Sequence, residues 1–214
     1  MKGWALGWLL PGLCAGPVAA QHASLGPMLG VAEYREVASS LRYSGLGPGA
    51  TARVTWHRFT IDAAITSLRM TPASGSAATQ GFRALEIDGW LRWDALDYVS
   101  FEVGLTRRTP DSDFAAQSLG AVRAGACARY LLGPGATIWL RGDYLAGAQF
   151  SGGGSAPLAL ELALGLDVQL SPHLRAAADY SFQRLDRKTN PAGGAETSVP
   201  IEQSLAHAGL AVAF

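Results

Sequence analysis

Apolar residues recur at every second position through most of this chain. In "LALELALGLDVQL" (158–170), leucines alternate with small or polar residues. Leu, Ala and Glu all favour helices, but a helix would scatter leucines with this period around all of its faces. A strand would collect them on one face, because successive side chains of a strand point to opposite sides. The pattern therefore predicts a strand.

Seven further segments show the same alternation, and each is longer than a typical strand of a soluble protein. They are "RFTIDAAIT" (58–66), "ALEIDGWLRW" (84–93), "DYVSFEVGLT" (97–106), "AVRAGACARYLL" (121–132), "TIWLRGDYLAGA" (137–148), "LRAAADYSFQRL" (174–185) and "EQSLAHAGLAVAF" (202–214). Strands of soluble sandwiches average about five or six residues, whereas a tilted membrane-spanning strand needs about 9–11. The lengths favour membrane-spanning strands.

The face opposite the apolar one carries charged residues in mid-strand, which predicts that it lines the inside of a closed barrel. Acids and arginines are interleaved on this face, so we expect a lumenal network of charge-assisted hydrogen bonds. Its expected members are Arg58, Asp62, Glu86, Asp88, Arg92, Glu102, Arg123, Arg129, Arg141, Asp143, Glu161, Asp167, Arg175, Asp179 and His207.

The connections between these segments alternate in length. Tight turns are expected at 93–97, 132–135 and 170–173, and longer links rich in Gly, Pro and Ser at 71–80, 107–117, 149–157 and 186–200. Outer-membrane barrels have short periplasmic turns and longer external loops. With both chain ends on the periplasmic side, the number of strands is expected to be even.

The region before residue 51 decides between eight and ten strands. The hexapeptide "LGPGAT" occurs at 46–51 and again at 132–137, and we interpret both copies as periplasmic turns. Residues 26–46 would then cross the membrane twice, with a hinge near "EVAS" (36–39). The fold predicted is therefore all-β, a closed antiparallel transmembrane barrel of ten strands. The alternative has eight strands and an N-terminal extension or plug.

Residues 1–20 are expected to be a cleaved export signal, followed by the barrel over 21–214. Lys2 precedes an apolar stretch, and Val18-Ala19-Ala20 fits the small-residue cleavage rule. Lys+Arg and Asp+Glu are balanced at 17 each, which gives no indication of a nucleic-acid partner. No CxxC motif or histidine-rich cluster suggests a metal, and no cofactor is expected. Beyond the signal, Cys127 is the single cysteine, so no intramolecular disulfide can form.

The last segment carries the most specific motif. Counting back in twos from the aromatic Phe214 gives Val212, Leu210, Ala208 and Ala206. A final alternating strand that ends in Phe, after an export signal, resembles the outer-membrane β-barrel proteins of Gram-negative bacteria. The resemblance implies that these five residues are read by the barrel-assembly machinery. It further implies periplasmic chaperones and outer-membrane lipids as partners.

Three functions are compatible with such a barrel. Side chains can largely fill the interior of a barrel of eight to ten strands, so the first expectation is a charge-filled, plugged lumen with a structural or membrane-interaction role. A narrow pore for small solutes is the alternative. The resemblance also allows a lipid-modifying enzyme or a protease, but catalysis is the least expected, because the only nearby grouping is Glu202, Ser204 and His207. By alternation Ser204 faces lipid and His207 faces the lumen, whereas a nucleophile and its base must share one face.

Overall fold

The computed structural model describes residues 22–189 and 197–214, so the expected export signal lies outside the described residues. Nearly all of the described chain is strand. The long strands are β1 (His22–Glu36), β2 (Leu41–Trp56), β3 (Phe59–Pro72), β4 (Phe82–Leu96), β5 (Val99–Pro110), β6 (Leu119–Gly133), β7 (Ala136–Phe150), β9 (Ala159–Ser171), β10 (Leu174–Thr189) and β11 (Thr197–Ala213). The short elements are strand β8 (Ser155–Ala156) and the 3-10 helix η1 (Ser112–Gln117).

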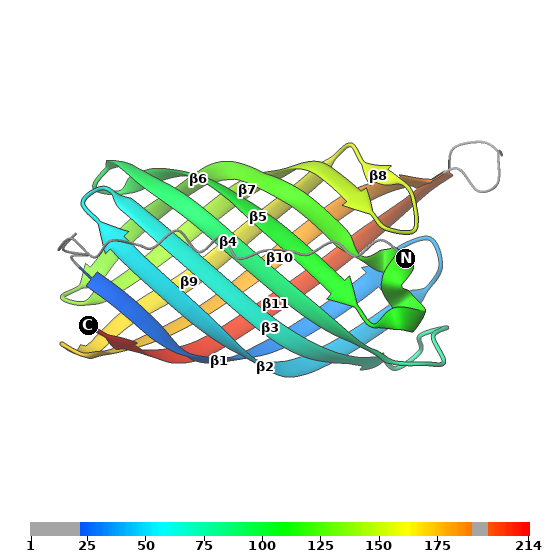
Figure 1. Cartoon of the computed structure of the whole chain (residues 1–214), viewed down its shortest axis with the longest axis horizontal. Helices are drawn as coiled ribbons and strands as arrows, with labels where there is room; N and C mark the ends of the chain where they lie inside the picture. The colour runs from blue at the N-terminus through cyan, green and yellow to red at the C-terminus, as the bar shows by residue number, and fades with distance from the viewer. Residues whose placement is uncertain (1–21, 190–196) are drawn as a thin grey trace, which may run out of the picture.

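The ten long strands form one closed antiparallel barrel (Figure 1). Each strand pairs with its neighbour along the chain, and β1 closes the ring by pairing with β11 from Ser24↔Ala213 to Glu36↔Ile201. The short β8 adds a bridge between β7 and β10. Closure leaves no free sheet edge, as a β-structure surrounded by lipid requires. The predicted fold class is confirmed, including the ten strands.

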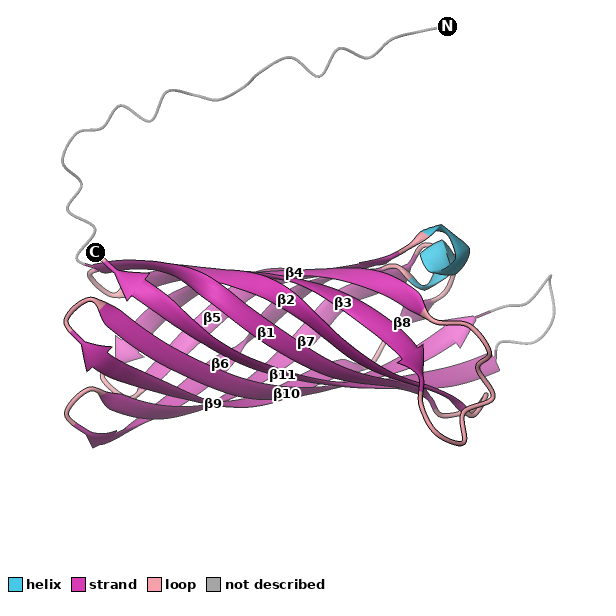
Figure 2. Cartoon of the chain, turned by 90° about the horizontal axis from the view of Figure 1, so that it is seen from below, coloured by secondary structure: helices cyan, strands magenta, loops and turns pink. Residues whose placement is uncertain are grey.

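The two ends of the barrel differ in their connections. At one end, which we call the short-turn end, pairs of residues at 57–58, 97–98, 134–135 and 172–173 join the strands, and β11 finishes there. At the other, the loop end, the described links are longer and include η1. Figure 2 shows the C-terminus at the short-turn end and the helix at the loop end. This arrangement has the alternation of short and long connections that the sequence predicted.

The first copy of "LGPGAT" is not a turn. Residues 46–51 lie inside β2, where Leu46 pairs with Val31 and Pro48 with Leu29 of β1. The ladder to β3 skips the Gly47 and Pro48 positions, because proline has no N–H to donate there. Glycine is required beside it, since a Cβ at Gly47 would lie 1.7 Å from the Ser67 carbonyl oxygen.

The second copy does turn, between β6 and β7, with Gly135 at φ +78°. A proline–glycine sequence therefore gave the wrong position for the first turn. The actual turn between β2 and β3 lies at residues 57–58, with His57 at φ 53°. The hinge expected near 36–39 is confirmed by the turn at 37–40 between β1 and β2.

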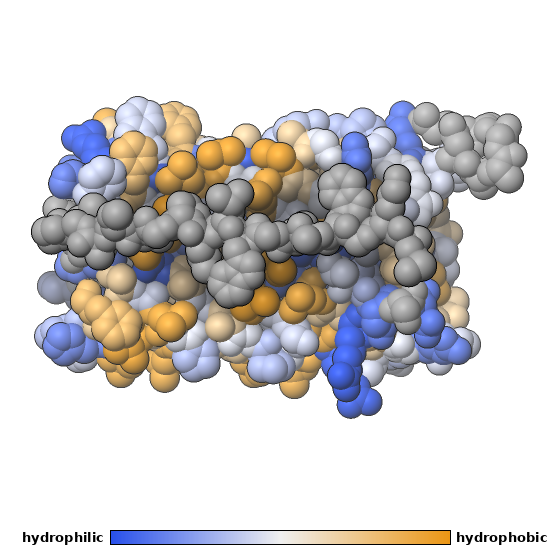
Figure 3. Space-filling model, in the orientation of Figure 1, coloured by the Kyte–Doolittle hydropathy of each residue, from blue (hydrophilic) through white to orange (hydrophobic). Residues whose placement is uncertain are grey.

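The outer wall of the barrel carries an apolar belt. Leu162 and Leu105 on this wall are 62% and 65% exposed. Aromatic side chains at the short-turn end of the belt include Trp93, which stacks on Phe101 with 6.3 Å between ring centroids. Figure 3 shows apolar residues over the middle of one face and hydrophilic residues toward both ends. Within the described residues, no helix is long and apolar enough to cross a bilayer.

Candidate functional site in the barrel lumen

With one exception, the residues expected in the lumenal network lie on the inner face of the barrel. Their side chains are buried or half-buried and point across the lumen from eight strands: Asp62 (β3), Glu86, Asp88 and Arg92 (β4), Glu102 (β5), Arg123 and Arg129 (β6), Arg141 and Asp143 (β7), Glu161 and Asp167 (β9), Arg175 and Asp179 (β10), and His207 (β11).

Two arginines organise the middle of the lumen. Arg141 lies 2.6 Å from Glu161, 3.0 Å from Asp143 and 3.3 Å from Glu102. Arg123 lies 3.0 Å from Glu161 and 2.7 Å from Asp88. Both guanidinium groups are buried, and a buried charge persists in a protein when it is paired. Glu161 of β9 pairs with both arginines, so this one carboxylate connects Arg123 of β6 with Arg141 of β7.

Trp90 of β4 completes this layer. Its indole ring contacts both guanidinium groups, with 4.8 Å from Arg123 and 4.7 Å from Arg141 to a ring centroid. Cations over an indole face are attracted by its quadrupole. The indole and the ion pairs of Arg123 and Arg141 therefore form one packed layer across the middle of the lumen, which we call the arginine–tryptophan layer.

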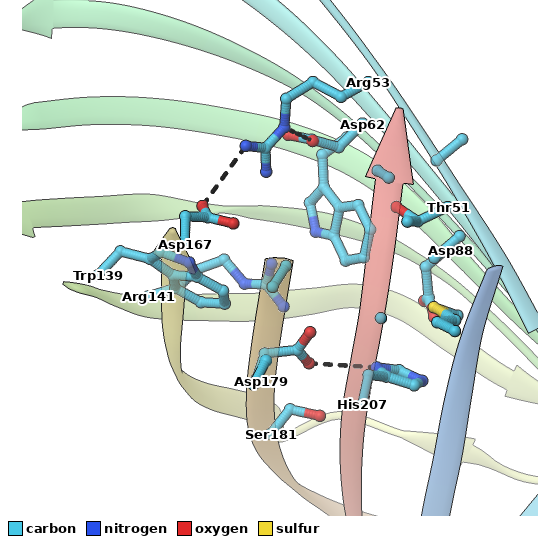
Figure 4. Close-up of a pocket in the computed structure, with 18 of the residues that line it drawn as sticks. Thr51, Arg53, Asp62, Asp88, Trp139, Arg141, Asp167, Asp179, Ser181 and His207 are labelled. Atoms are coloured by element: carbon cyan, nitrogen blue, oxygen red, sulfur yellow. Dashed lines mark hydrogen bonds and ion pairs between the residues drawn. The ribbon is translucent and has the colours of Figure 1, made fainter. Parts of the chain in front are cut away.

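A second ion-pair cluster lies nearer the short-turn end. Arg53 of β2 pairs with Asp62 and, at 3.4 Å, with Asp167 (Figure 4). Asp167 also pairs with Arg175. Arg92 connects the two clusters, because it lies 3.2 Å from Asp62 and 3.4 Å from Glu102. The charges thus form a continuous network rather than separate pairs.

Arg58 is the exception among the expected members, and Arg53 takes its place. Arg58 is exposed in the turn between β2 and β3, where it donates to the Ala95 carbonyl at 3.5 Å. The sequence predicted a turn at 46–51, and for this reason Arg53 was not included among the expected lumenal residues. The sequence signal for Arg53 is its alternation with the apolar Val54 and Trp56. These two side chains lie on the outer face, so Arg53 faces the lumen.

A cavity of about 110 Å³ lies among these charges. Its lining includes Arg53, Asp167, Trp139 and His207 (Figure 4). A hollow at the short-turn end shares Arg53, Arg92, Trp139, Asp167 and Arg175 with it. The volume has room for several water molecules. Solvent from the short-turn end can therefore reach the polar part of the lumen.

His207 joins a short relay of polar groups. Its Nδ1 lies 3.1 Å from Asp179 and its Nε2 lies 3.2 Å from the Thr66 hydroxyl. A hydroxyl, an imidazole and a carboxylate in this order are the arrangement of an activated nucleophile. Thr66, however, is only 2% exposed and is absent from the cavity lining. A substrate in the cavity would not reach its hydroxyl.

The grouping considered for catalysis is not assembled. Ser204 accepts a hydrogen bond from the Tyr180 hydroxyl at 2.9 Å, on the outer wall. Glu202 lies 3.4 Å from Arg184, which is also on the outer wall. His207 points inward to Asp179. Across the described residues, no group of three or more His, Cys, Asp or Glu side chains could hold a metal ion.

The loop end of the lumen is mainly apolar and has a smaller polar group, in which Glu36 accepts hydrogen bonds from Tyr34, Ser39 and Gln117. An apolar cluster fills it, and Leu145, Leu185 and Ile201 within it are 0% exposed. Phe114 of η1 extends the cluster from the loop side by stacking on Phe82, with 4.6 Å between ring centroids. The apolar cluster consists of Ala32, Tyr34, Tyr43, Leu68, Met70, Phe82, Ala84, Leu119, Ala121, Leu145, Ala148, Phe150, Ala156, Ala159, Leu185, Ile201 and Leu205.

The polarity of the wall therefore inverts along some of the strands, as on β3 and β4. On β4, Asp88 points inward and Ile87 outward, whereas nearer the loop end Phe82 points inward and Arg83 outward. On β3 the same change leads from an inward Asp62 to an inward Leu68 beside an outward Arg69. The short-turn side has the polar interior and apolar exterior of a membrane barrel, and the loop end has the reverse, as in a water-soluble barrel.

The motif of the last strand lies on the outer wall. Leu210, Val212 and Phe214 are 50%, 48% and 76% exposed. The backbone N–H of Phe214 donates to the Ala23 carbonyl at 2.9 Å, which extends the seam between β11 and β1 to the end of the barrel.

Comparison of the whole chain with solved structures matches this architecture. An outer membrane channel from Pseudomonas putida F1 superimposes with a TM-score of 0.52, covering 90% of this chain and 95% of the channel at 11% identity. The chain folds as a Gram-negative outer-membrane β-barrel. Neisserial surface protein A (14% identity, 89% and 96% coverage) and the outer membrane protease OmpT from Escherichia coli (10%, 92% and 98%) give TM-scores of 0.45 and 0.48.

These identities concern the fold alone and indicate no subfamily of outer-membrane barrels. No protein-family model matches the sequence, and no curated protein matches it. What this barrel does must therefore be argued from its own lumen and surfaces.

Proposed function

We propose that the protein resides in the bacterial outer membrane as a non-conducting barrel, with its loop end outside the cell and its short-turn end in the periplasm. The observation that carries this proposal is the apolar cluster, in which Leu145, Leu185 and Ile201 are inaccessible to water. A diffusion channel needs a polar, water-filled path, as in porins. The barrel then acts through its surfaces, in a structural or membrane-interaction role.

The energetics of the lumen support a closed state. Burying one large aliphatic side chain contributes about 1.5–3 kcal/mol, so displacing several members of the cluster at once is costly. Below the cluster, separating Arg141 from its three carboxylates would leave buried charges without partners. Two barriers of different chemistry therefore lie in series.

A narrow pore for small solutes is the second candidate. The cavity of about 110 Å³ and the adjoining hollow support it, because they provide a polar path from the short-turn end to the arginine–tryptophan layer. To conduct, such a pore would need a second state in which the apolar cluster moves aside. The proposal assigns no catalytic role; the burial of Thr66 and the outward position of Ser204 support this assignment.

Conductance of the refolded protein in planar bilayers tests the proposal. We expect no discrete openings from the wild type, and openings from the triple variant Leu145→Gly, Leu185→Gly, Ile201→Gly. The matched control replaces three outward leucines, Leu160→Gly, Leu162→Gly and Leu164→Gly, and should stay silent. Heat-modifiable migration in gels verifies that every variant is folded. Regular openings from the wild type would instead establish the pore.

A further inference from the structure

Six arginines lie on the outer wall where its polarity inverts. They are Arg35, Arg42, Arg69, Arg83, Arg107 and Arg184, and all are exposed on strands β1 to β5 and β10. We call them the arginine girdle. Each lies on the loop-end side of the apolar belt. On β5, for example, Arg107 is the next outward residue after Leu105. The girdle thus covers the boundary between the belt and the solvated loop end over one sector of the barrel.

The strand register places two pairs of these arginines directly opposite each other. Arg35 of β1 pairs with Arg42 of β2, and Arg69 of β3 pairs with Arg83 of β4. Side chains in such positions start about 4.5–5.5 Å apart at Cβ, and like charges there destabilise a sheet. Two repulsive pairs on one wall require a compensating interaction.

The chain provides that compensation for only part of the girdle. Arg35 and Arg184 share the carboxylate of Glu202, at 3.9 Å and 3.4 Å, and Arg184 also lies 3.2 Å from Asp186. Over residues 22–189 and 197–214, Arg69, Arg83 and Arg107 form no ion pair. Glu33 is exposed on the same wall but is likewise without an ion pair there. Asp111 lies beside Arg83, and its carboxylate accepts a hydrogen bond from the Arg83 backbone N–H at 3.1 Å. It forms no ion pair with either guanidinium group, so two arginines against this one acid leave the Arg69–Arg83 site positively charged.

We propose that the Arg69–Arg83 pair binds the phosphate of an anionic lipid headgroup in the leaflet around the loop end. Guanidinium groups bind phosphate through paired, charge-assisted hydrogen bonds, and a bridging phosphate would cancel the repulsion between two arginines. A lipid supplies the phosphate at this depth because the acyl chains of the same molecule lie against the adjoining belt. The outward Leu85 and Ile87 provide that apolar surface below Arg83.

This inference depends on the orientation in the proposed function but not on the absence of conductance, so bilayer recordings cannot decide it. The test is native mass spectrometry of the full-length folded barrel, released from detergent after titration with lipid A that bears both phosphates. Dephosphorylated lipid A and inorganic phosphate are titrated in parallel. We expect the phosphorylated lipid to be retained and the dephosphorylated lipid to bind at least about tenfold more weakly, because charge-assisted hydrogen bonds are lost.

The variants separate a specific site from general surface charge. Arg69→Gln with Arg83→Gln should weaken binding by about tenfold or more, whereas Arg69→Lys with Arg83→Lys should have a smaller effect, because it keeps the charge and loses the paired geometry. Arg184→Gln, in a position that already has two carboxylate partners, is the matched control and should bind as the wild type does. All of these side chains are on the surface, and heat modifiability verifies folding.

Three results of the lipid titrations would overturn the proposal. They are equal retention of phosphorylated and dephosphorylated lipid, unchanged binding by the Arg69→Gln, Arg83→Gln variant, and an equal loss from Arg184→Gln. Tight binding of inorganic phosphate without preference for the lipid would show an anion site rather than a lipid site, and would also contradict it.

Discussion

The two ends of this barrel are built by the same ten strands yet have opposite interiors. Toward the short-turn end, Arg53, Asp167 and Arg175 surround a cavity, and the outer wall carries Trp56 and Trp93. At the loop end, Leu185 and Ile201 fill the lumen and the outer wall carries arginines. Alternation along a strand thus determines which residues share a face, while the surrounding solvent determines which face is apolar.

This difference locates the membrane on the molecule. A wall that faces lipid must be apolar, so its partner face can hold charges only if they are paired inside. Where water surrounds the wall, the ordinary rule returns and the apolar residues move inward. Toward the loop end of β4, the outward residue changes from Leu85 to Arg83 and the inward residue changes from Glu86 to Phe82. This change marks the boundary of the bilayer on the loop side.

The largest expected effect comes from breaking the charged half of the lumen. Arg141→Met removes one of the two arginine partners of Glu161 and of Glu102, and it leaves the buried carboxylate of Asp143 unpaired. Removing one partner of a buried ion pair costs about 3–5 kcal/mol. We expect a corresponding loss in the free energy of unfolding, measured by urea titration in lipid vesicles. Arg58→Met, at the exposed turn, is the control and should cost little; equal losses would contradict the network.

Opening the apolar half should cost nearly as much. Leu145→Ala deletes a fully buried side chain, and such truncations cost about 2–5 kcal/mol. The comparison variant is Leu140→Ala on the same strand, whose side chain is 58% exposed on the outer wall. The same unfolding titration should show a clearly smaller loss for Leu140→Ala. A reversed order would mean that the inner and outer faces are wrongly assigned at the loop end.

Arginine substitutions at different positions on the outer face of β4 should show where along the strand the bilayer ends. Arg on the lipid face costs about 2–4 kcal/mol at the midplane and about 0–1 kcal/mol near an interface. We expect Leu91→Arg to be the costly change and Leu85→Arg, beside the native Arg83, to be nearly neutral. Unfolding free energies in vesicles check this order. Similar costs at both positions would contradict the boundary drawn at Arg83.

The smallest effect is expected at the helix that covers the loop end. Phe114→Ala removes the stacking on Phe82, and an aromatic pair of this kind contributes about 0.5–1.5 kcal/mol. The barrel should remain folded, with somewhat faster hydrogen exchange at the loop ends of β4 and β6. Ala115→Gly in the same helix is the control, and a global loss of protection from Phe114→Ala would contradict a local role.

Much of this architecture could be predicted from the sequence because the period of two is local. Asp88 between Ile87 and Gly89, or Glu161 between Leu160 and Leu162, indicates its inward direction without knowledge of distant strands. The first "LGPGAT" could not be placed in this way. Its glycines and proline favour a turn, whereas its pairing with β1, from Leu46↔Val31 to Thr51↔Gly26, keeps it extended.

The apolar cluster was not predicted, for a related reason. Its members come from the loop ends of strands that are far apart in the sequence, such as Tyr43, Phe82 and Leu185. Reversed alternation was the available signal: "LRM" at 68–70 and "FRA" at 82–84 each place an arginine between two apolar residues. In a strand that also has acids at its middle, such a triplet indicates the part of the strand that lies outside the membrane.

Accessibility of spin labels along the outer face of β4 tests the inversion of polarity most directly. Single cysteines at Arg83→Cys, Leu85→Cys, Ile87→Cys and Leu91→Cys, in a Cys127→Ser background, carry the label in lipid vesicles. We predict that collisions with oxygen dominate at positions 87 and 91, and that collisions with a water-soluble nickel complex dominate at position 83. Oxygen accessibility at position 83 equal to that at position 87 would place the loop end inside the bilayer and contradict the account.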